Sequence, residues 1–98
     1  MKISVVSGGF DPLHSGHISY LEGAKREGEI LIVALNSNEW LIKKKGKYFL
    51  PFSERKIILE SLIQVDEVIN FDDDKEGSCK NALIKIKKRY PKDKIIFC

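Results

Sequence analysis

The sequence predicts an α/β fold in three layers, α/β/α, around a parallel sheet with strand order 3-2-1-4. Four short apolar runs lack the alternation of half-buried strands, which is typical of strands buried on both faces of a parallel sheet. Segments with helical spacing separate these runs, and glycine or proline marks most junctions. Because crossovers between parallel strands are right-handed, this alternation places helices on both faces of a Rossmann-like sheet.

The first strand and the first helix flank a pair of glycines. Residues 3–6 form a β-branched apolar run that ends at Gly8-Gly9, and they predict a buried strand. From Ser15 the apolar period changes to that of a helix, which is expected to end near Gly28. Residues 30–35, Ile-Leu-Ile-Val-Ala-Leu, then predict a second buried strand.

The second half of the chain repeats this alternation around a basic segment. Residues 36–38 are expected to close the second strand and to cap a short helix that continues through Leu41. Residues 43–52 predict a basic, mobile loop, and Ser53 is the expected cap of the helix after it. The remaining elements are predicted at residues 68–69 (strand), 81–89 (helix) and from 94 onward (strand).

Composition places the chain among ordinary soluble globular domains. Its 98 residues suit at most one domain, with 43% hydrophobic and 32% charged residues. The net charge of +3 suits an anionic small molecule but is too weak to indicate nucleic acid. No apolar run approaches the roughly 18 residues that span a membrane. Cys79 and Cys98 have no metal-binding spacing, so we expect a cytoplasmic protein with two incidental thiols.

Most of the chemistry lies in the stretch from Gly8 to His17, after the first strand. Its glycine pair lets the backbone approach a ligand closely, and the pattern His-x-Gly-His then opens a helix. Free N–H groups and the positive dipole end at a helix start form a phosphate site, where each imidazole can add a donor. Gly16 leaves room for a phosphate or a base against the backbone.

Simpler interpretations of the single residues stay open. A lone histidine at a helix start is more often a cap or a surface residue, and a Gly-Gly pair is often only a turn. A two-histidine metal site lacks a third ligand other than Asp11, so no metal ligand is assigned. The acidic triplet at residues 72–74 is expected to be a solvated loop.

Residues 9–17, Gly-Phe-Asp-Pro-Leu-His-Ser-Gly-His, resemble the signature of the cytidylyltransferase-like nucleotidyltransferases. The similarity continues to about Asp74, most like the heptose-phosphate adenylyltransferase branch, with the polyol-phosphate cytidylyltransferases a close second. Full-length members continue past the fourth strand with a glycine- and acid-containing turn and a serine/threonine-rich motif. The resemblance implies that residues 1–98 are the N-terminal part of a nucleotidyltransferase domain, with the C-terminal part absent.

The resemblance also implies which residues carry the site. His14 and His17 would contact the triphosphate and stabilise charge on the α-phosphorus. A lysine would clamp the phosphates, at Lys44 by the cytidylyltransferase pattern and at Lys43 by the heptose pattern; a solvated loop lysine is the alternative. Nucleotide or phosphate contacts are further implied for Gly8, Gly9, Phe10, Asp11, Gly16 and Arg55.

Two of these residues have a second interpretation. Asp11 would lie near the acceptor phosphate or the metal region, or would instead cap the helix or brace the turn. Arg55 lies in the first turn of a predicted helix, where a positive charge is disfavoured by the helix dipole. Its forked guanidinium group suits a phosphate. A surface salt bridge is the alternative for Arg55.

The implied reaction transfers a cytidylyl or adenylyl group from CTP or ATP to a phosphorylated sugar or polyol and releases pyrophosphate, with Mg²⁺ as cofactor. The alternative is a truncated, non-catalytic nucleotide-binding module. A fragment of a class I aminoacyl-tRNA synthetase fits less well, because the chain is short and only mildly basic. No nucleic-acid or membrane partner is expected, and a homodimer would help a chain of this size to bury its core.

Overall fold

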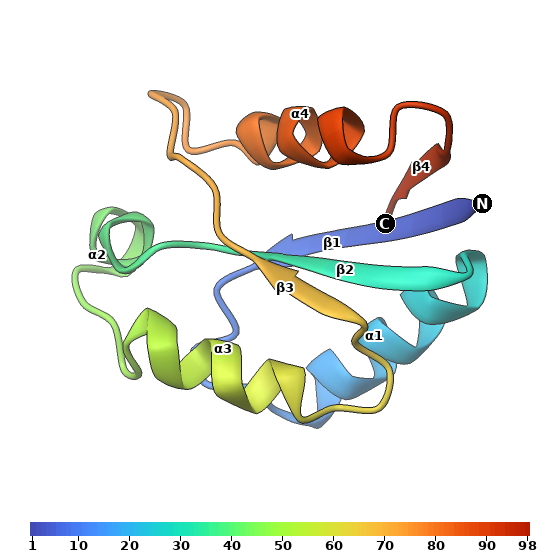
Figure 1. Cartoon of the computed structure of the whole chain (residues 1–98). Coiled ribbons are helices and arrows are strands. Elements are labelled where there is room, and N and C mark those ends of the chain that lie inside the picture. Colours follow the sequence, from blue (N-terminus) through green and yellow to red (C-terminus); the bar gives the residue numbers. More distant parts are fainter.

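The computed structural model describes residues 1–98 and confirms the predicted α/β fold, a parallel sheet between helical layers (Figure 1). All strands pair in parallel in the predicted order, β3-β2-β1-β4, and Val5 of β1 lies opposite Ile32 of β2. The strands are β1 (Lys2–Gly8), β2 (Ile30–Leu35), β3 (Glu67–Ile69) and β4 (Lys94–Phe97).

Helices cover both faces of this sheet. Figure 1 shows α1 and α3 on one face and α4 on the other, with α2 beyond the carboxyl ends of β1 and β2. None of the helices is long and apolar enough to cross a membrane. Their bounds are α1 (Ser15–Glu27), α2 (Asn38–Lys45), α3 (Phe52–Glu60) and α4 (Lys80–Arg89).

Successive residues of β1 belong to two separate apolar cores, one on each face of the sheet. Val6 packs in one core with Leu21 of α1 and Leu59 of α3, all fully buried. Val5 packs in the other core with Ile86 of α4. Burying each large aliphatic side chain contributes about 1.5–3 kcal/mol. Burial on both faces therefore fixes β1, and the glycine turn after it, in one position.

The connections that follow β1, β2 and β3 all leave from the same edge of the sheet, because parallel strands place their carboxyl ends together (Figure 1). Ligands of such sheets bind at this edge. The predicted strand at 68–69 and the predicted helix at 81–89 both form, each one residue longer at its start. These elements therefore place the stretch from Gly8 to His17 at this edge of the sheet.

The predicted mobile loop at 43–52 is wrong in its first part. Lys43, Lys44 and Lys45 form the last turn of α2, where cations favour the negative end of the helix dipole. The helix ends at Gly46, whose φ of 86° is the left-handed conformation that glycine adopts without strain. These three lysines therefore belong to α2, and the loop is confined to residues 46–51.

The predicted cap at Ser53 is also wrong. Pro51 is the residue before α3, and Ser53 lies inside the helix without a capping hydrogen bond. The amide of Phe52 instead donates to Oδ1 of Asn38, 2.8 Å away on α2. The side chain of Asn38 on α2 thus caps the start of α3, the role that the sequence assigned to the hydroxyl of Ser53.

Candidate functional site

A cleft of about 510 Å³ lies at the carboxyl end of β1, between the head of α1 and α2. Gly9, His14 and His17 line one side of it, and Trp40 and Lys44 line the other. Phe10, Asp11, Pro12, Leu41 and Lys45 complete its walls. The structure therefore brings both predicted histidines and one predicted lysine to the same cavity.

The two histidines are held by a reciprocal cap at the start of α1. The Nδ1 atom of His14 accepts from the Gly16 amide at 3.1 Å, and Nδ1 of His17 accepts from the His14 amide at 3.1 Å. The rings stack with centroids 3.9 Å apart and planes 27° from parallel. A neutral imidazole whose Nδ1 accepts must carry its proton on Nε2. Both histidines therefore keep an Nε2–H donor that the cap does not use.

The surroundings of His17 favour this neutral form. Burial lowers the pKa of His17 below its ordinary value of 6.5, and its electrostatic interaction with the neighbouring His14 lowers the pKa further. The edge of the Phe10 ring packs on His17, with centroids 4.9 Å apart. His17 is thus a neutral hydrogen-bond donor at pH 7, with a ring fixed by packing on both sides.

Two of the predicted glycines allow the site's side chains to pack closely. A Cβ on Gly16 would stand 2.9 Å from Cε1 of His14, so a side chain there would displace the capping ring. A Cβ on Gly9 would stand 2.7 Å from Cδ2 of Leu41 on α2. Glycine at position 16 therefore keeps room for the capping ring of His14, and glycine at position 9 lets α2 approach the turn.

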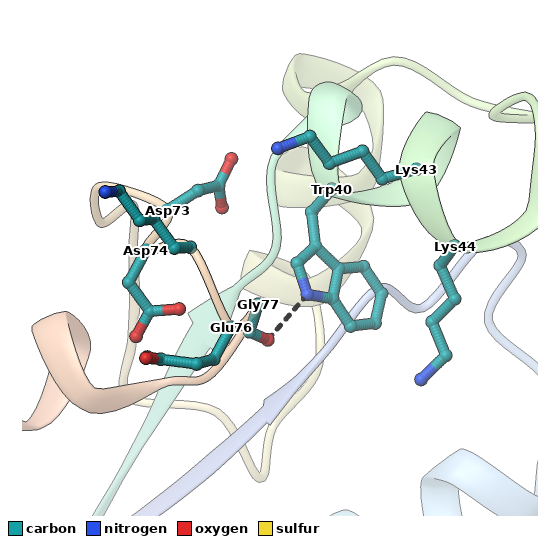
Figure 2. A pocket seen from close by; sticks show the side chains of 8 residues that line it. Trp40, Lys43, Lys44, Asp73, Asp74, Glu76 and Gly77 are labelled. Atoms are coloured by element: carbon teal, nitrogen blue, oxygen red, sulfur yellow. Dashed lines mark hydrogen bonds between the residues drawn. The ribbon is translucent and has the colours of Figure 1, made fainter.

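The structure distinguishes the two lysines, Lys43 and Lys44, between which the sequence could not choose. The Nζ atom of Lys44 lies 4.7 Å from the centroid of the Trp40 ring, in cation–π contact. Figure 2 shows Lys43 leaving α2 toward Asp73, away from Lys44. Lys44 lines the histidine cleft, whereas Lys43 does not.

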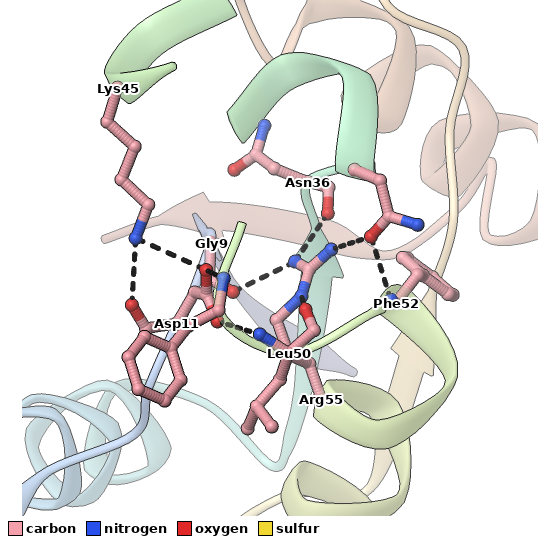
Figure 3. Close-up of polar contacts among 9 residues, drawn as sticks. Gly9, Asp11, Asn36, Lys45, Leu50, Phe52 and Arg55 are labelled. Carbon is pink, nitrogen blue, oxygen red and sulfur yellow. Dashed lines mark hydrogen bonds and ion pairs between the residues drawn. The ribbon is translucent and has the colours of Figure 1, made fainter. Parts of the chain in front are cut away.

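Asp11 braces the turn between β1 and α1 (Figure 3). Its side chain, 1% exposed, accepts from the amides of Phe49 and Leu50 at 2.5 and 2.6 Å and pairs with Lys45 at 3.2 Å. Burial alone would raise the pKa of Asp11, but the two amides and Lys45 lower the pKa below its ordinary value. These contacts belong to the bracing role that the sequence left open.

Arg55 is not at the surface, so the predicted alternative of a surface salt bridge is wrong. The residue is 1% exposed, and its guanidinium donates to carbonyl oxygens of three separate segments (Figure 3). Those acceptors are Leu50 at 2.9 Å, Gly9 at 3.0 Å and Asn36 at 2.7 Å, and Oδ1 of Asn38 accepts a fourth bond at 2.8 Å. Four of the five guanidinium hydrogens are thus used within the chain, and Arg55 does not line the histidine cleft. Burial lowers the pKa of Arg55, and Asp11 raises it.

Sequence reasoning did not assign four residues that shape this site: Asn36, Asn38, Trp40 and Lys45. Asn36 and Asn38 directly follow β2, so their place at the carboxyl edge of the sheet was a usable signal. Trp40 is the only tryptophan, but no local pattern marks it. No group of three or more His, Cys, Asp or Glu side chains is arranged to hold a metal ion.

Comparison with solved structures supports the fold. The crystal structure of the lipopolysaccharide core biosynthesis protein from Thermoplasma volcanium GSS1 matches with a TM-score of 0.73 and 21% identity. The match covers 99% of this chain and 94% of that one. At this identity, the similarity concerns the fold alone.

Comparison with curated proteins and family profiles gives the affiliation. Glycerol-3-phosphate cytidylyltransferase of Bacillus subtilis (strain 168) is 45% identical over 69 residues, 70% of this chain and 54% of the relative. The bifunctional protein HldE of Citrobacter koseri is 43% identical over 75 residues, 74% of this chain and 16% of HldE. The chain thus spans about half the length of the first relative and a smaller part of the second. The profile of the cytidylyltransferase-like family matches residues 5–97, and the chain belongs to this family.

Proposed function

We propose that the chain is the nucleotide-transferring part of an enzyme that moves a cytidylyl or adenylyl group to a phosphorylated sugar or polyol. A phosphate oxygen of the acceptor attacks the α-phosphorus of the nucleoside triphosphate. A new phosphorus–oxygen bond forms, the bond to the β-phosphate oxygen breaks, and pyrophosphate leaves. The observation that carries this proposal is the histidine pair, with each Nδ1 occupied in the cap and each Nε2–H unused.

The arrangement suits charge stabilisation during phosphoryl chemistry. Nucleotidyl transfer needs positioning and donors where charge develops, and it needs no protein nucleophile. His14 and His17 offer two such donors at the positive end of α1. Lys44 adds a positive charge from the opposite wall of the same cleft. The cleft thus combines neutral donors, a helix terminus and a cation, as a triphosphate requires.

Mg²⁺ is expected to enter with the nucleotide. The chain's own side chains form no three-ligand group for a metal, and the Asp11 carboxylate already accepts two amides and pairs with Lys45. Mg²⁺ is commonly held through substrate phosphates and water with few protein carboxylates. We therefore assign no metal ligand; bound Mg²⁺ would neutralise the departing pyrophosphate.

The named relatives support the acceptor class. The Bacillus subtilis relative is named for glycerol 3-phosphate and cytidylyl transfer. The sequence resemblance to heptose-phosphate adenylyltransferases keeps ATP as the alternative donor and a sugar phosphate as the alternative acceptor. The residues that line the histidine cleft suit either base and either acceptor.

The test is a turnover assay on the chain with CTP or ATP, Mg²⁺ and a panel of polyol and sugar phosphates. We expect pyrophosphate release with one nucleotide, and a loss of about 10²–10³ in rate for His17→Ala. Lys92→Gln, at the opposite edge of the sheet, is the control and retains full activity. Nucleotide binding without release would support the non-catalytic binding module instead, since the chain covers 54% of its Bacillus relative. Failure to bind either nucleotide would refute the phosphate site.

A further inference from the structure

A second cavity, of about 320 Å³, is lined by Trp40 but by neither histidine (Figure 2). It is formed between α2 and the connection that follows β3. Small-molecule sites begin at about this volume. Its lining residues are Trp40, Lys43, Lys44, Asp73, Asp74, Lys75, Glu76 and Gly77.

Trp40 and Lys44 line both cavities, so the second cavity lies next to the proposed reaction site. The indole Nε1 donates to the carbonyl oxygen of Gly77 at 2.9 Å, so the ring is tied to the connection that forms the opposite wall. Lys44 packs over the same ring. A ligand whose phosphate lies beside Lys44 would therefore extend past Trp40 into the second cavity.

The two cavities differ in charge. The histidine cleft contains two lysines and one carboxylate, Asp11, which is already fully engaged, so its balance suits a triphosphate. The second cavity contains three lysines and three carboxylates, so its net charge is zero. Such a cavity gains little from a polyanion but offers donors and acceptors together, which hydroxyl groups use in both directions.

Some of these charged groups make hydrogen bonds within the chain, and others make none. Asp73 accepts from the Ser37 hydroxyl at 2.6 Å, and Asp74 accepts from the amide and hydroxyl of Ser78. The Lys43 ammonium and the Glu76 carboxylate make no hydrogen bond or ion pair within the chain, although both line the cavity. The Lys75 ammonium is unpaired as well, so unused donors and an unused acceptor line the same space.

Resting on the proposed function, we propose that the second cavity binds the hydroxyl-bearing body of the phosphorylated acceptor, while Lys44 meets its phosphate. Lys43 donates to a hydroxyl oxygen and Glu76 accepts from a hydroxyl, with Trp40 covering the carbon chain. Lys43 and Glu76 are then specificity residues for polyol phosphates, and they make no contact with the triphosphate. The adjacent lysines Lys43 and Lys44 thus contact different groups of the same acceptor, a hydroxyl and the phosphate.

The test compares two probes of equal chain length, glycerol 3-phosphate and propyl phosphate, because only the first carries hydroxyl groups. Calorimetric titration of the chain with saturating nucleotide is expected to show glycerol 3-phosphate binding at least tenfold tighter. Lys43→Gln and Glu76→Gln are each expected to weaken glycerol 3-phosphate about tenfold and to leave propyl phosphate within twofold. Nucleotide affinity stays within twofold in both variants. Because both side chains are at the surface, unchanged melting temperatures should verify folding.

Lys44→Gln is the matched comparison, since it is expected to weaken nucleotide and both phosphate probes together. Equal binding of the two probes, or unchanged preference in both Lys43→Gln and Glu76→Gln, would overturn the acceptor cavity while leaving nucleotide binding and the proposed reaction intact. Nucleotide binding with no binding of glycerol 3-phosphate or of a hexose phosphate would overturn it as well. Loss of nucleotide binding in the unaltered chain would instead refute the proposed function itself.

Discussion

The histidine cap and the Asp11–Arg55 bracing network both hold the turn between β1 and α1, and they use their polar atoms differently. In the network, Asp11 accepts two amides and an ammonium, and Arg55 donates to three carbonyls and an amide oxygen. In the cap, each histidine uses one nitrogen for the fold and keeps the other. Polar groups that are fully paired hold the geometry, whereas half-paired groups remain available for chemistry.

The largest effect is expected for Arg55→Met, which removes four donors from a buried position. The carbonyls of Gly9, Asn36 and Leu50 would lose their partner, and each unpaired buried acceptor costs about 1–3 kcal/mol. We expect the free energy of unfolding in urea to fall by about 3 kcal/mol or more, with Arg55→Lys recovering part of it. A variant of unchanged stability would mean that Arg55 does not hold the turn.

The variant His14→Asn separates the capping role of residue 14 from its proposed role as a donor in the reaction. Asparagine is a strong N-cap whose Oδ1 can accept from Gly16, so stability is expected to stay within about 0.5 kcal/mol. The Nε2–H donor is lost, and the rate of pyrophosphate release is expected to fall about 10²-fold. Urea unfolding and the turnover assay measure the two quantities independently. Full activity in this variant would exclude His14 from the proposed chemistry.

The cap is also expected to respond to pH. Because the folded pKa of His17 lies below 6.5, the unfolded chain takes up the proton first as the pH falls. The stability contributed by neutral His17 is therefore complete above pH 6.5 and is lost as the pH falls through the folded pKa. Protonated Nδ1 could no longer accept from the His14 amide. Urea unfolding between pH 7.5 and about 5 should show a weaker pH dependence in His17→Gln, which retains an acceptor.

The difference between the histidine cap and the bracing network also explains which features could be predicted from the sequence. The buried strands and the histidine pair were predictable because uninterrupted apolar runs and the His-x-Gly-His spacing are local patterns. The role of Arg55 was not, because its burial depends on carbonyls that three distant segments bring together. Trp40 was missed for the same reason, since its partner Gly77 lies far along the chain. Local patterns thus predicted the histidines of the cleft, but not the distant contacts that support the turn beside them.

The smallest effect is expected for Lys45→Gln, at the edge of the bracing network. Lys45 is 43% exposed and pairs with Asp11 at 3.2 Å, so water screens much of the interaction. We expect a loss below about 1 kcal/mol in urea unfolding, because the amides of Phe49 and Leu50 still hold the carboxylate. Asp11→Ala is expected to cost about 2 kcal/mol or more, because it leaves those two amides unpaired. Equal losses in the two variants would mean that the ion pair, and not the amide contacts, fixes the turn.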